Sequence, residues 1–518
     1  MTGKILNSVT LNFTDLTGAK TGCTTLGSNK FWKGWVEDNG DGTGNFECRW
    51  GATGTPGKDT GSKRSIDLNT AQKLLDKKVK SKEKKGYTRL EVRSDEEEVA
   101  KAADNGVDLT KKTSKKKKTP KKKAVRKASF HPEVGRLLAT IYGKISNVVT
   151  AGLSAQAGAT ADNPIGNLSD RQLDIGGGVL DDIEALLTRE LGHENRTNRT
   201  QELALVNHIP SNDILDLTNQ YMSNVPREID RSMRGKSNLH RLVISSFERL
   251  EAQRKFLQLL RDAHLTKGVF KAAGSTTNTG DKEQIWYDGL NCFIELCESG
   301  SADFKKVAEI FNTNQSRKNA NWFRGGRSIL QLKRVFKFTR NNTEKAFNAY
   351  AKKMAVKPNP VGNIFAWHGT RTENLLGISQ TGLLMPENLP RGIHISGKAF
   401  GKGIYHAPVA SGMKSIQGVR TDGTNGALKS MNYTSAQGAY YSSNNTANQA
   451  FMYLQEVALG KGDIRTRSCW DKHRPDGWPE NDFIYAAAGG CSTLSHDELV
   501  TFDQDAQMFR YLIEVEVR

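Results

Sequence analysis

Two short blocks near the end of the chain carry residue types that could bind and orient a ligand. The first, Trp367 to Asn374, reads Trp-His-Gly-Thr-Arg-Thr-Glu-Asn and follows the apolar run Ile364 to Ala366. The second, Phe400 to Tyr405, reads Phe-Gly-Lys-Gly-Ile-Tyr. An apolar run that ends in His and Gly predicts a strand delivering a polar group into a cleft, where a residue without Cβ lets a ligand touch the backbone. The aromatic ring that ends the second block could close over a flat group.

Residues 1 to about 96 have the pattern of a small β-rich domain. The run from Phe31 to Val36 alternates aromatic residues with small or polar ones, as a strand does. A stretch dense in turn residues separates it from a returning strand, Phe46 to Trp50. Apolar residues at helical spacing between 71 and 84 predict one helix, and a strand from Tyr87 to Val92 closes the domain.

Residues 97 to 129 are predicted to be a basic, disordered linker. Lys and Arg crowd between residues 111 and 127 with no acidic residue among them, and such a segment cannot bury enough apolar surface to fold alone. The formal net charge of +19 favours polyanionic partners, chiefly nucleic acid, through neutralisation of phosphates. A nuclear localisation signal is a second interpretation of the run, and a solvated tail is a third.

From about residue 130 to 270 the apolar spacing is that of helices. One helix is predicted over Leu137 to Val148 and a second over Arg171 to Leu187, with Ser169 as the N-cap of the second. A third is predicted over Val243 to Leu260. The region therefore reads as an all-α bundle.

Three consecutive glycines, Gly176 to Gly178, interrupt the second predicted helix. Each interior glycine weakens a helix by about 0.8–1 kcal/mol relative to alanine. Close packing against a neighbouring element would explain them. So would a segment tuned to unfold, because elements that move are drawn from the least stable parts of a protein.

The remaining composition narrows the class of protein. Six cysteines are scattered without a Cys-x-x-Cys pair, so neither a disulfide framework nor a metal site is predicted. No N-terminal apolar segment and no run of 18 apolar residues occurs, so secretion and contact with a membrane are not expected. A length of 518 residues favours about three domains, in an intracellular and nuclear protein.

The two blocks described first belong to a longer series. Lys429 to Tyr433 reads Lys-Ser-Met-Asn-Tyr after an apparent insertion at 412–428, and Asp497 to Asp503 reads Asp-Glu-Leu-Val-Thr-Phe-Asp. Together the four blocks, in this order, resemble the NAD-binding signature of the poly(ADP-ribose) polymerases. The resemblance implies that residues 275 to 518 form an ADP-ribosyltransferase catalytic domain that uses NAD+ as its substrate and needs no metal.

The resemblance also implies roles for individual side chains. Glu498 stands where the family has its catalytic Glu, which would hold the ribose 2′-OH and stabilise positive charge on the ribose as its bond to nicotinamide breaks. His368 would hold the adenosine-side ribose, and Tyr405 completes the implied catalytic set. The implied NAD contacts are His368, Gly369, Thr370, Asn374, Gly377, Tyr405, Ser430 and Tyr433.

Two pairs within this set would hold nicotinamide. The backbone of Gly369 and the hydroxyl of Ser430 would bind its carboxamide, while Tyr405 and Tyr433 would enclose its ring. Leu384 stands where family members often have Arg, so one contact to the adenosine half has no counterpart.

The rest of the chain resembles the same family. Asn29 to Gly51 is similar to the WGR domain, whose Trp packs on the terminal sugar of a DNA end, so Trp50 is the expected DNA contact. Ala52 replaces the family's Arg, so the phosphate or interdomain contact of that Arg has no counterpart. Pro164 to Leu173 and Asp213 to Pro226 resemble the regulatory helical domain, which covers the NAD site until DNA binding loosens it.

The predicted architecture is a multidomain α+β chain. It comprises a β-rich WGR-like domain (1–96), a basic linker (97–129), an all-α regulatory bundle (130–270) and a mixed α/β ADP-ribosyltransferase domain with antiparallel sheets (275–518). The implied function is poly(ADP-ribosyl) transfer from NAD+, stimulated by DNA ends or nicks. The implied acceptors are the protein itself and chromatin or repair proteins such as histones. Two alternatives stay open: an enzyme limited to mono(ADP-ribosyl) transfer, and a DNA-end-binding scaffold with weak NAD activity.

Overall fold

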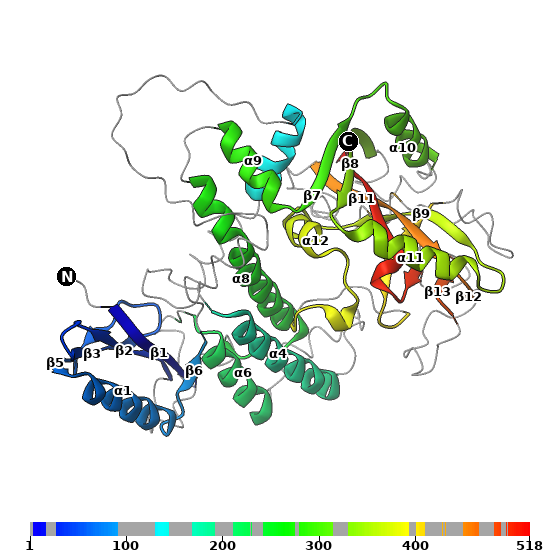
Figure 1. The fold of residues 1–518 in the computed structure, drawn as a ribbon. Coiled ribbons are helices and arrows are strands. Elements are labelled where there is room, and N and C mark those ends of the chain that lie inside the picture. Colours follow the sequence, from blue (N-terminus) through cyan, green and yellow to red (C-terminus); the bar gives the residue numbers. More distant parts are fainter. Residues whose placement is uncertain are drawn as a thin grey trace, which may run out of the picture. The chain divides into compact units, whose positions relative to one another are not determined.

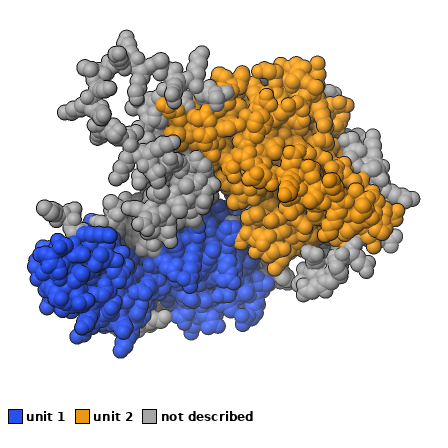
Figure 2. Space-filling view, in the orientation of Figure 1, with its two compact units in different colours: residues 1–98, 146–267, 390–394 blue, residues 99–145, 268–389, 395–518 orange. Residues whose placement is uncertain are grey.

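The chain divides into two compact units, shown in blue and orange in Figure 2. Unit 1 comprises residues 1–98, 146–267 and 390–394, and unit 2 comprises residues 99–145, 268–389 and 395–518. The computed structural model describes residues 4–16, 27–91, 130–143, 168–191, 211–227, 229, 242–274, 279–313, 330–392, 400–409, 427, 430, 449–465, 481–487, 494 and 496–517. Within those residues, no helix is both long and apolar enough to span a lipid bilayer.

Unit 1 begins with a six-stranded sheet in the order β4-β3-β2-β1-β6, with β5 paired to β3. The helix α1 lies against this sheet (Figure 1), and its apolar residues complete the core beneath Trp32 and Val36. The predicted strands and helix of this region are confirmed, except that Val92, the predicted end of the closing strand, lies outside the described residues. The elements are β1 Lys4–Asp15, β2 Ser28–Asp38, β3 Thr43–Ala52, β4 Lys58–Asp59, β5 Lys63–Asp67, α1 Leu68–Glu83 and β6 Thr88–Leu90.

Besides α1, the described helices of unit 1 are α4 Asp170–Leu191, α6 Asn212–Asn224 and α8 Phe247–Gly274, whose residues after Lys267 belong to unit 2. Ser169 caps α4 as predicted, because its hydroxyl accepts a hydrogen bond from the Gln172 backbone N–H at 3.1 Å. Residues 132–143, which unit 2 includes, form the first predicted helix, whose predicted end at Val148 lies outside the described residues.

The predicted start of the third helix at Val243 is wrong. The helix α8 begins at Phe247, and the Ser246 hydroxyl accepts from the Arg249 backbone N–H at 3.3 Å. A serine N-cap satisfies one of the free N–H groups of a first turn, and this signal outweighs the apolar spacing that includes Val243. Val243 is nevertheless fully buried, as part of the core of the unit.

Other parts of unit 1 pack closely against the three glycines of α4. A Cβ added at Gly176 would lie 2.4 Å from Val225 Cγ2, and one added at Gly177 would lie 2.2 Å from the carbonyl oxygen of Arg391. At Gly178 the nearest atom would be Arg391 Nη1 at 2.8 Å. These contacts support close packing as the reason for the glycines.

Hydrogen bonds join the sheet of unit 1 to α6. The Asn12 amide on β1 donates to the Met222 carbonyl at 3.2 Å, and the Thr14 backbone N–H donates to the Ser223 hydroxyl at 3.0 Å. The Leu16 backbone N–H donates to Asn219 Oδ1 at 2.9 Å. Because Asn12 and Thr14 are buried, these bonds tie the β-rich domain to the helices.

Unit 2 contains a nine-stranded sheet in the order β12-β13-β14-β10-β9-β11-β15-β8-β7, in which only the β12–β13 pair of the described strands is parallel. The multidomain α+β fold class is confirmed. The strands are β7 Cys292–Cys297, β8 Leu330–Arg340, β9 Gly362–Gly369, β10 Ile404–Pro408, β11 Gln449–Leu459, β12 Gly462–Arg465, β13 Phe483–Ala486, β14 Glu498–Thr501 and β15 Gln507–Val517.

Helices pack on this sheet around separate apolar clusters. Phe311 of α10 (Ala302–Thr313) packs edge-on against Trp367 of β9, and Phe347 of α11 (Thr343–Ala355) packs with Met508 of β15. Figure 1 shows α10 and α11 at different parts of the sheet. The other helical elements of unit 2 are α9 Thr279–Gly289, α12 Leu375–Thr381, η6 Thr372–Asn374, η7 Pro386–Asn388 and η8 Gln504–Ala506.

Candidate active site

The three predicted catalytic residues lie on three adjacent strands of unit 2. His368 is on β9, Tyr405 on β10 and Glu498 on β14, and β10 pairs with both of its neighbours. The apolar run that precedes His368 forms β9, as its pattern predicts. His368 and Tyr405 are 37 positions apart in the chain, and Tyr405 and Glu498 are 93 apart. The sheet brings all three to one place.

His368 is held in one tautomer. Its Nδ1 lies 3.1 Å from the carbonyl oxygen of Tyr405, and because a carbonyl can only accept, Nδ1 must carry the proton. Burial lowers the pKa of His368, against the opposing effect of this hydrogen bond. A neutral ring in this tautomer leaves Nε2 as a hydrogen-bond acceptor, which suits a ligand hydroxyl.

Tyr405 is fixed at its hydroxyl. The hydroxyl accepts from the Phe400 backbone N–H at 2.8 Å and donates to the Gly401 carbonyl at 3.0 Å. Gly401 has a φ of +84°, and a Cβ added at Gly403 would lie 2.5 Å from Val500 Cγ1. The glycines of this block therefore shape the loop that anchors the ring.

Gly369 and Ser430 meet at their backbones. A Cβ added at Gly369 would lie 1.7 Å from the carbonyl oxygen of Ser430, so no other residue type fits there. The Ser430 side chain is buried, and its hydroxyl has no hydrogen-bond partner among the described residues. A buried hydroxyl without a partner among the described residues, on a residue that contacts the half-buried Gly369, is suited to a polar ligand group.

Three further predicted contacts follow β9. Thr370 is buried and its hydroxyl accepts from the Asn374 amide at 3.3 Å. Gly377 lies on α12, and a Cβ added there would meet no atom within 4 Å. Space beside Gly377 is thus open to a ligand or to solvent.

Glu498 is the first residue of β14 and is half-buried opposite Ala486 of β13. Direct contacts join His368 to Tyr405 and Gly369 to Ser430, whereas the role of Glu498 stays a prediction. Tyr433 and nearly all of the apparent insertion at 412–428 lie outside the described residues.

Metal-binding geometry is not found in the described part of the chain, where no group of three or more His, Cys, Asp or Glu residues comes together. Cys292 donates to the Ser379 carbonyl at 3.2 Å, and burial raises the pKa of its thiol to about 12. This thiol therefore stays protonated and is a poor metal ligand.

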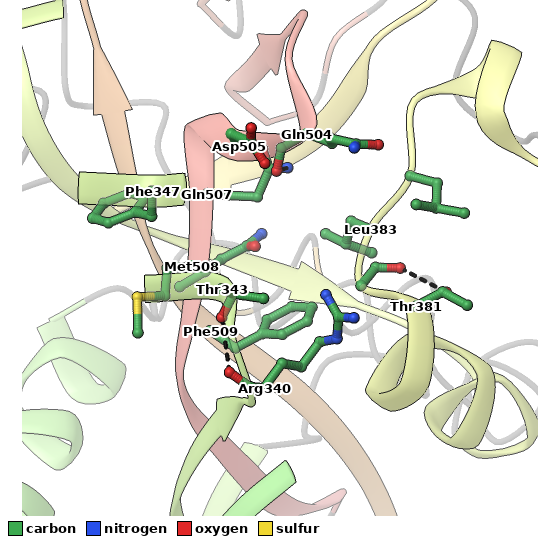
Figure 3. Close-up of a pocket in the computed structure, with 13 residues that line it drawn as sticks. Arg340, Thr343, Phe347, Thr381, Leu383, Gln504, Asp505, Gln507, Met508 and Phe509 are labelled. Carbon is green, nitrogen blue, oxygen red and sulfur yellow. Dashed lines mark hydrogen bonds between the residues drawn. The ribbon is translucent and has the colours of Figure 1, made fainter. Parts of the chain in front are cut away.

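A cavity of about 80 Å³ lies elsewhere in unit 2 (Figure 3). None of the predicted NAD contacts that the structure describes lines it, although Leu384 does. Its polar lining includes Gln455 and Gln507, which the sequence analysis did not single out. The signal that could have found Gln455 is a polar residue directly after an apolar run, as it follows Ala450 to Leu454 in β11. Its lining residues are Arg340, Thr343, Phe347, Thr381, Gly382, Leu383, Leu384, Gln455, Gln504, Asp505, Gln507, Met508 and Phe509.

Trp50, in unit 1, is exposed rather than part of a core. Its side chain is 43% accessible, and its indole N–H donates to the Thr60 hydroxyl at 2.5 Å. The neighbouring strand places Lys58 opposite Trp50 in register. An oriented, exposed indole ring beside a cation is suited to a nucleic-acid end.

Comparisons with known protein families match three parts of the chain. Residues 301–517 match the poly(ADP-ribose) polymerase catalytic domain, and residues 129–286 match the poly(ADP-ribose) polymerase regulatory domain. Residues 7–94 match the WGR domain. The three matches follow one another along the chain and leave residues 1–6, 95–128, 287–300 and 518 unmatched.

Curated proteins with similar sequences include several named poly [ADP-ribose] polymerase 1. The chain is 24% identical to that of Arabidopsis thaliana over 318 residues, which are 61% of this chain and 26% of the relative. It is 25% identical to that of Oryza sativa subsp. japonica over 258 residues, 50% of this chain and 22% of the relative. It is 23% identical to that of Caenorhabditis elegans over 368 residues, 68% of this chain and 34% of the relative. The chain thus spans about a quarter of the length of the two plant relatives.

Proposed function

Because the chain belongs to the poly(ADP-ribose) polymerase family, we propose that it is an NAD+-dependent poly(ADP-ribosyl)transferase stimulated by DNA breaks. Its acceptors are itself and chromatin or repair proteins in the nucleus. The contact between Gly369 and Ser430 supports this proposal most, because it brings the Gly369 backbone next to a residue whose buried hydroxyl has no partner among the described residues. The nicotinamide carboxamide offers one acceptor and one donor group that match them.

The other side chains have complementary tasks. The Tyr405 ring, fixed through its hydroxyl, stacks on the nicotinamide ring. His368 accepts a hydrogen bond from a ribose hydroxyl at Nε2, since Nδ1 is already engaged by the Tyr405 carbonyl. Thr370 and Asn374 bind the same ligand next to it, and Tyr433 encloses the second face of the nicotinamide ring.

The reaction breaks the bond between nicotinamide N1 and ribose C1′. The bonding electron pair leaves with nicotinamide, which loses its positive charge, while positive charge develops on the ribose. Glu498 holds the 2′-OH and stabilises that charge. The acceptor oxygen then bonds to C1′ and releases its proton to Glu498 or to water.

A DNA end would act on unit 1. Trp50 packs on the end, and the strand that carries it ends directly before Thr53, whose hydroxyl donates to Asn12 Oδ1 at 2.8 Å. The Asn12 amide in turn donates to the Met222 carbonyl on α6. These bonds support a physical connection from the DNA contact to the regulatory helices, which DNA binding is proposed to loosen.

A glycine pair tests the proposed NAD chemistry. The variant Gly369→Ala should lose nicotinamide release from NAD+ by at least about a hundredfold, because its methyl group displaces the Ser430 backbone. Gly300→Ala is the matched control, since a Cβ there meets no atom within 4 Å. Nicotinamide released by the wild-type chain and by Gly300→Ala, but not by Gly369→Ala, supports the proposal. Equal release by all three variants would contradict it.

A further inference from the structure

Strand β10 is short, yet it positions two of the predicted site residues. It spans only Ile404–Pro408, with three residue pairs to β14 and two to β9. Yet it carries the Tyr405 ring, and the Tyr405 carbonyl holds His368. Backbone pairing alone gives this strand few hydrogen bonds, so a side-chain anchor would have a large effect on its position.

A buried chain of hydrogen bonds passes through the next residue, His406. We call it the His406 chain, and it consists of Gln455, His406, Thr501 and Gln507. The Gln455 amide lies 2.7 Å from His406 Nδ1, and His406 Nε2 lies 2.9 Å from the Thr501 hydroxyl. That hydroxyl lies 3.1 Å from Gln507 Oε1. All four residues are buried and lie on four different strands, β11, β10, β14 and β15.

The direction of every bond in the His406 chain follows from its last one. Gln507 Nε2 donates to the Gln504 carbonyl at 2.6 Å, so Gln507 Oε1 faces Thr501 and must accept the hydroxyl proton. The Thr501 oxygen then accepts from His406 Nε2–H. Nδ1 of His406 is therefore a lone-pair acceptor for the Gln455 N–H. His406 is thus neutral and in the tautomer opposite to that of His368.

Gln455, at one end of the His406 chain, lines the cavity of Figure 3. Gln455 pairs with Ala366 on β9, a side chain small enough for the amide to pass over it to His406. Gln455 Oε1 is buried and has no partner among the described residues, and Gln455 lines the cavity together with Gln507. Burying so many polar groups beside an apolar sheet is costly unless they are paired, and a paired network fixes one arrangement of its strands.

We infer that His406 is a positioning residue for ADP-ribosyl transfer, which holds β10 so that Tyr405 and His368 meet NAD+ in the correct orientation. The inference rests on the proposed function. His406 acts from both sides of the strand, towards β11 through Gln455 and towards β14 through Thr501. Because β14 also carries Glu498, the same anchor sets the separation between the stacking ring and the carboxylate.

The test measures nicotinamide affinity by calorimetry and kcat and KM for NAD+ in the full chain. Thr501→Val replaces one hydroxyl by a methyl group, and His406→Phe removes both hydrogen bonds of the imidazole. Each should raise the Kd for nicotinamide and the KM for NAD+ by about tenfold, because a tenfold change in affinity corresponds to about the net free energy of one hydrogen bond. The double variant should be no worse than His406→Phe alone, because both changes break one chain.

The control is Tyr511→Phe, which removes the 2.6 Å hydrogen bond from β15 to Asp303 of α10. It should lower the melting temperature as Thr501→Val does and leave nicotinamide affinity unchanged. Variants of the His406 chain that lose thermal stability but keep the wild-type Kd for nicotinamide would overturn the inference. If His406→Phe does not fold, Thr501→Val alone decides. A wild-type chain that binds no nicotinamide would overturn the proposed function itself, and the inference with it.

Discussion

Glu498 is the residue on which the proposed chemistry depends most. Glu498→Gln keeps the size and hydrogen-bonding reach of the side chain but removes the charge that stabilises the ribose in the transition state. An interaction of about 3 kcal/mol corresponds to roughly a hundredfold in rate. Polymer formation should therefore collapse, while NAD+ hydrolysis or transfer of a single unit partly survives. Product length on a gel is the measurement.

The matched control for that variant is Glu387→Gln, at an exposed position in η7. It should make polymer like the wild type. Polymer of normal length from Glu498→Gln would remove Glu498 from its proposed role.

His368 gives a prediction about pH. Burial lowers its pKa below the ordinary value of 6.5, so the unfolded chain takes up the proton at a higher pH than the folded one. The His368 imidazole therefore does not destabilise the folded chain above pH 6.5. Below pH 6.5 it destabilises the folded chain increasingly, as the pH falls towards the pKa of the folded state. The same protonation occupies Nε2, which is the proposed acceptor for a ribose hydroxyl.

Accordingly, kcat/KM for NAD+ should show no loss from His368 between pH 8 and 6.5 and should fall at lower pH. In His368→Gln, which keeps an acceptor but does not titrate, kcat/KM should be lower throughout and this acidic limb should disappear. An acidic limb with its midpoint above pH 6.5 that vanishes in the variant would show that the pKa of His368 is raised in the folded enzyme, which would contradict the prediction.

At the scale of elements, the glycines of α4 make a matched pair. Gly177→Ala places its methyl group 2.2 Å from the Arg391 backbone and should destabilise unit 1 by about 1–3 kcal/mol, as overpacking does. Gly178→Ala meets only the flexible end of the Arg391 side chain and should stabilise α4 by up to about 1 kcal/mol. Thermal unfolding measures both. Stabilisation by both variants would show that the segment 390–392 does not pack on α4.

The elements themselves were largely predictable from local patterns. The alternation in β2, the turn that follows it and the serine cap of α4 each depend on neighbours in the sequence. The start of α8 was misplaced because Val243 is buried by tertiary packing without being helical. Close packing was one of two explanations predicted for Gly177, but its neighbour Arg391 was not predictable, because Arg391 lies far along the chain.

The candidate active site was predictable for a different reason. Its residues stand in spaced blocks that resemble a family, and the structure adds contacts such as that between Gly369 and Ser430. The His406 chain was not predictable, since it joins four strands through polar side chains that match no motif. Only the strand order shows that Gln455 and His406 are close together.

For the whole molecule, the basic run should contribute to DNA binding through charge alone. Deleting residues 111–127 should weaken binding to all DNA and flatten the dependence of log affinity on log salt, because counterion release scales with the phosphates neutralised. Trp50→Ala should instead reduce the preference for ends over continuous duplex. A slope unchanged by the deletion would leave the run as a localisation signal or a spacer.

The central claim is that one chain joins recognition of a DNA break to transfer of ADP-ribose. The most direct measurement incubates the full chain with labelled NAD+, with and without 5′-phosphorylated nicked DNA, and resolves the products by length. We expect long polymers attached to the protein with nicked DNA and little product without it. Single ADP-ribose units under both conditions, or no labelled product at all, would contradict it.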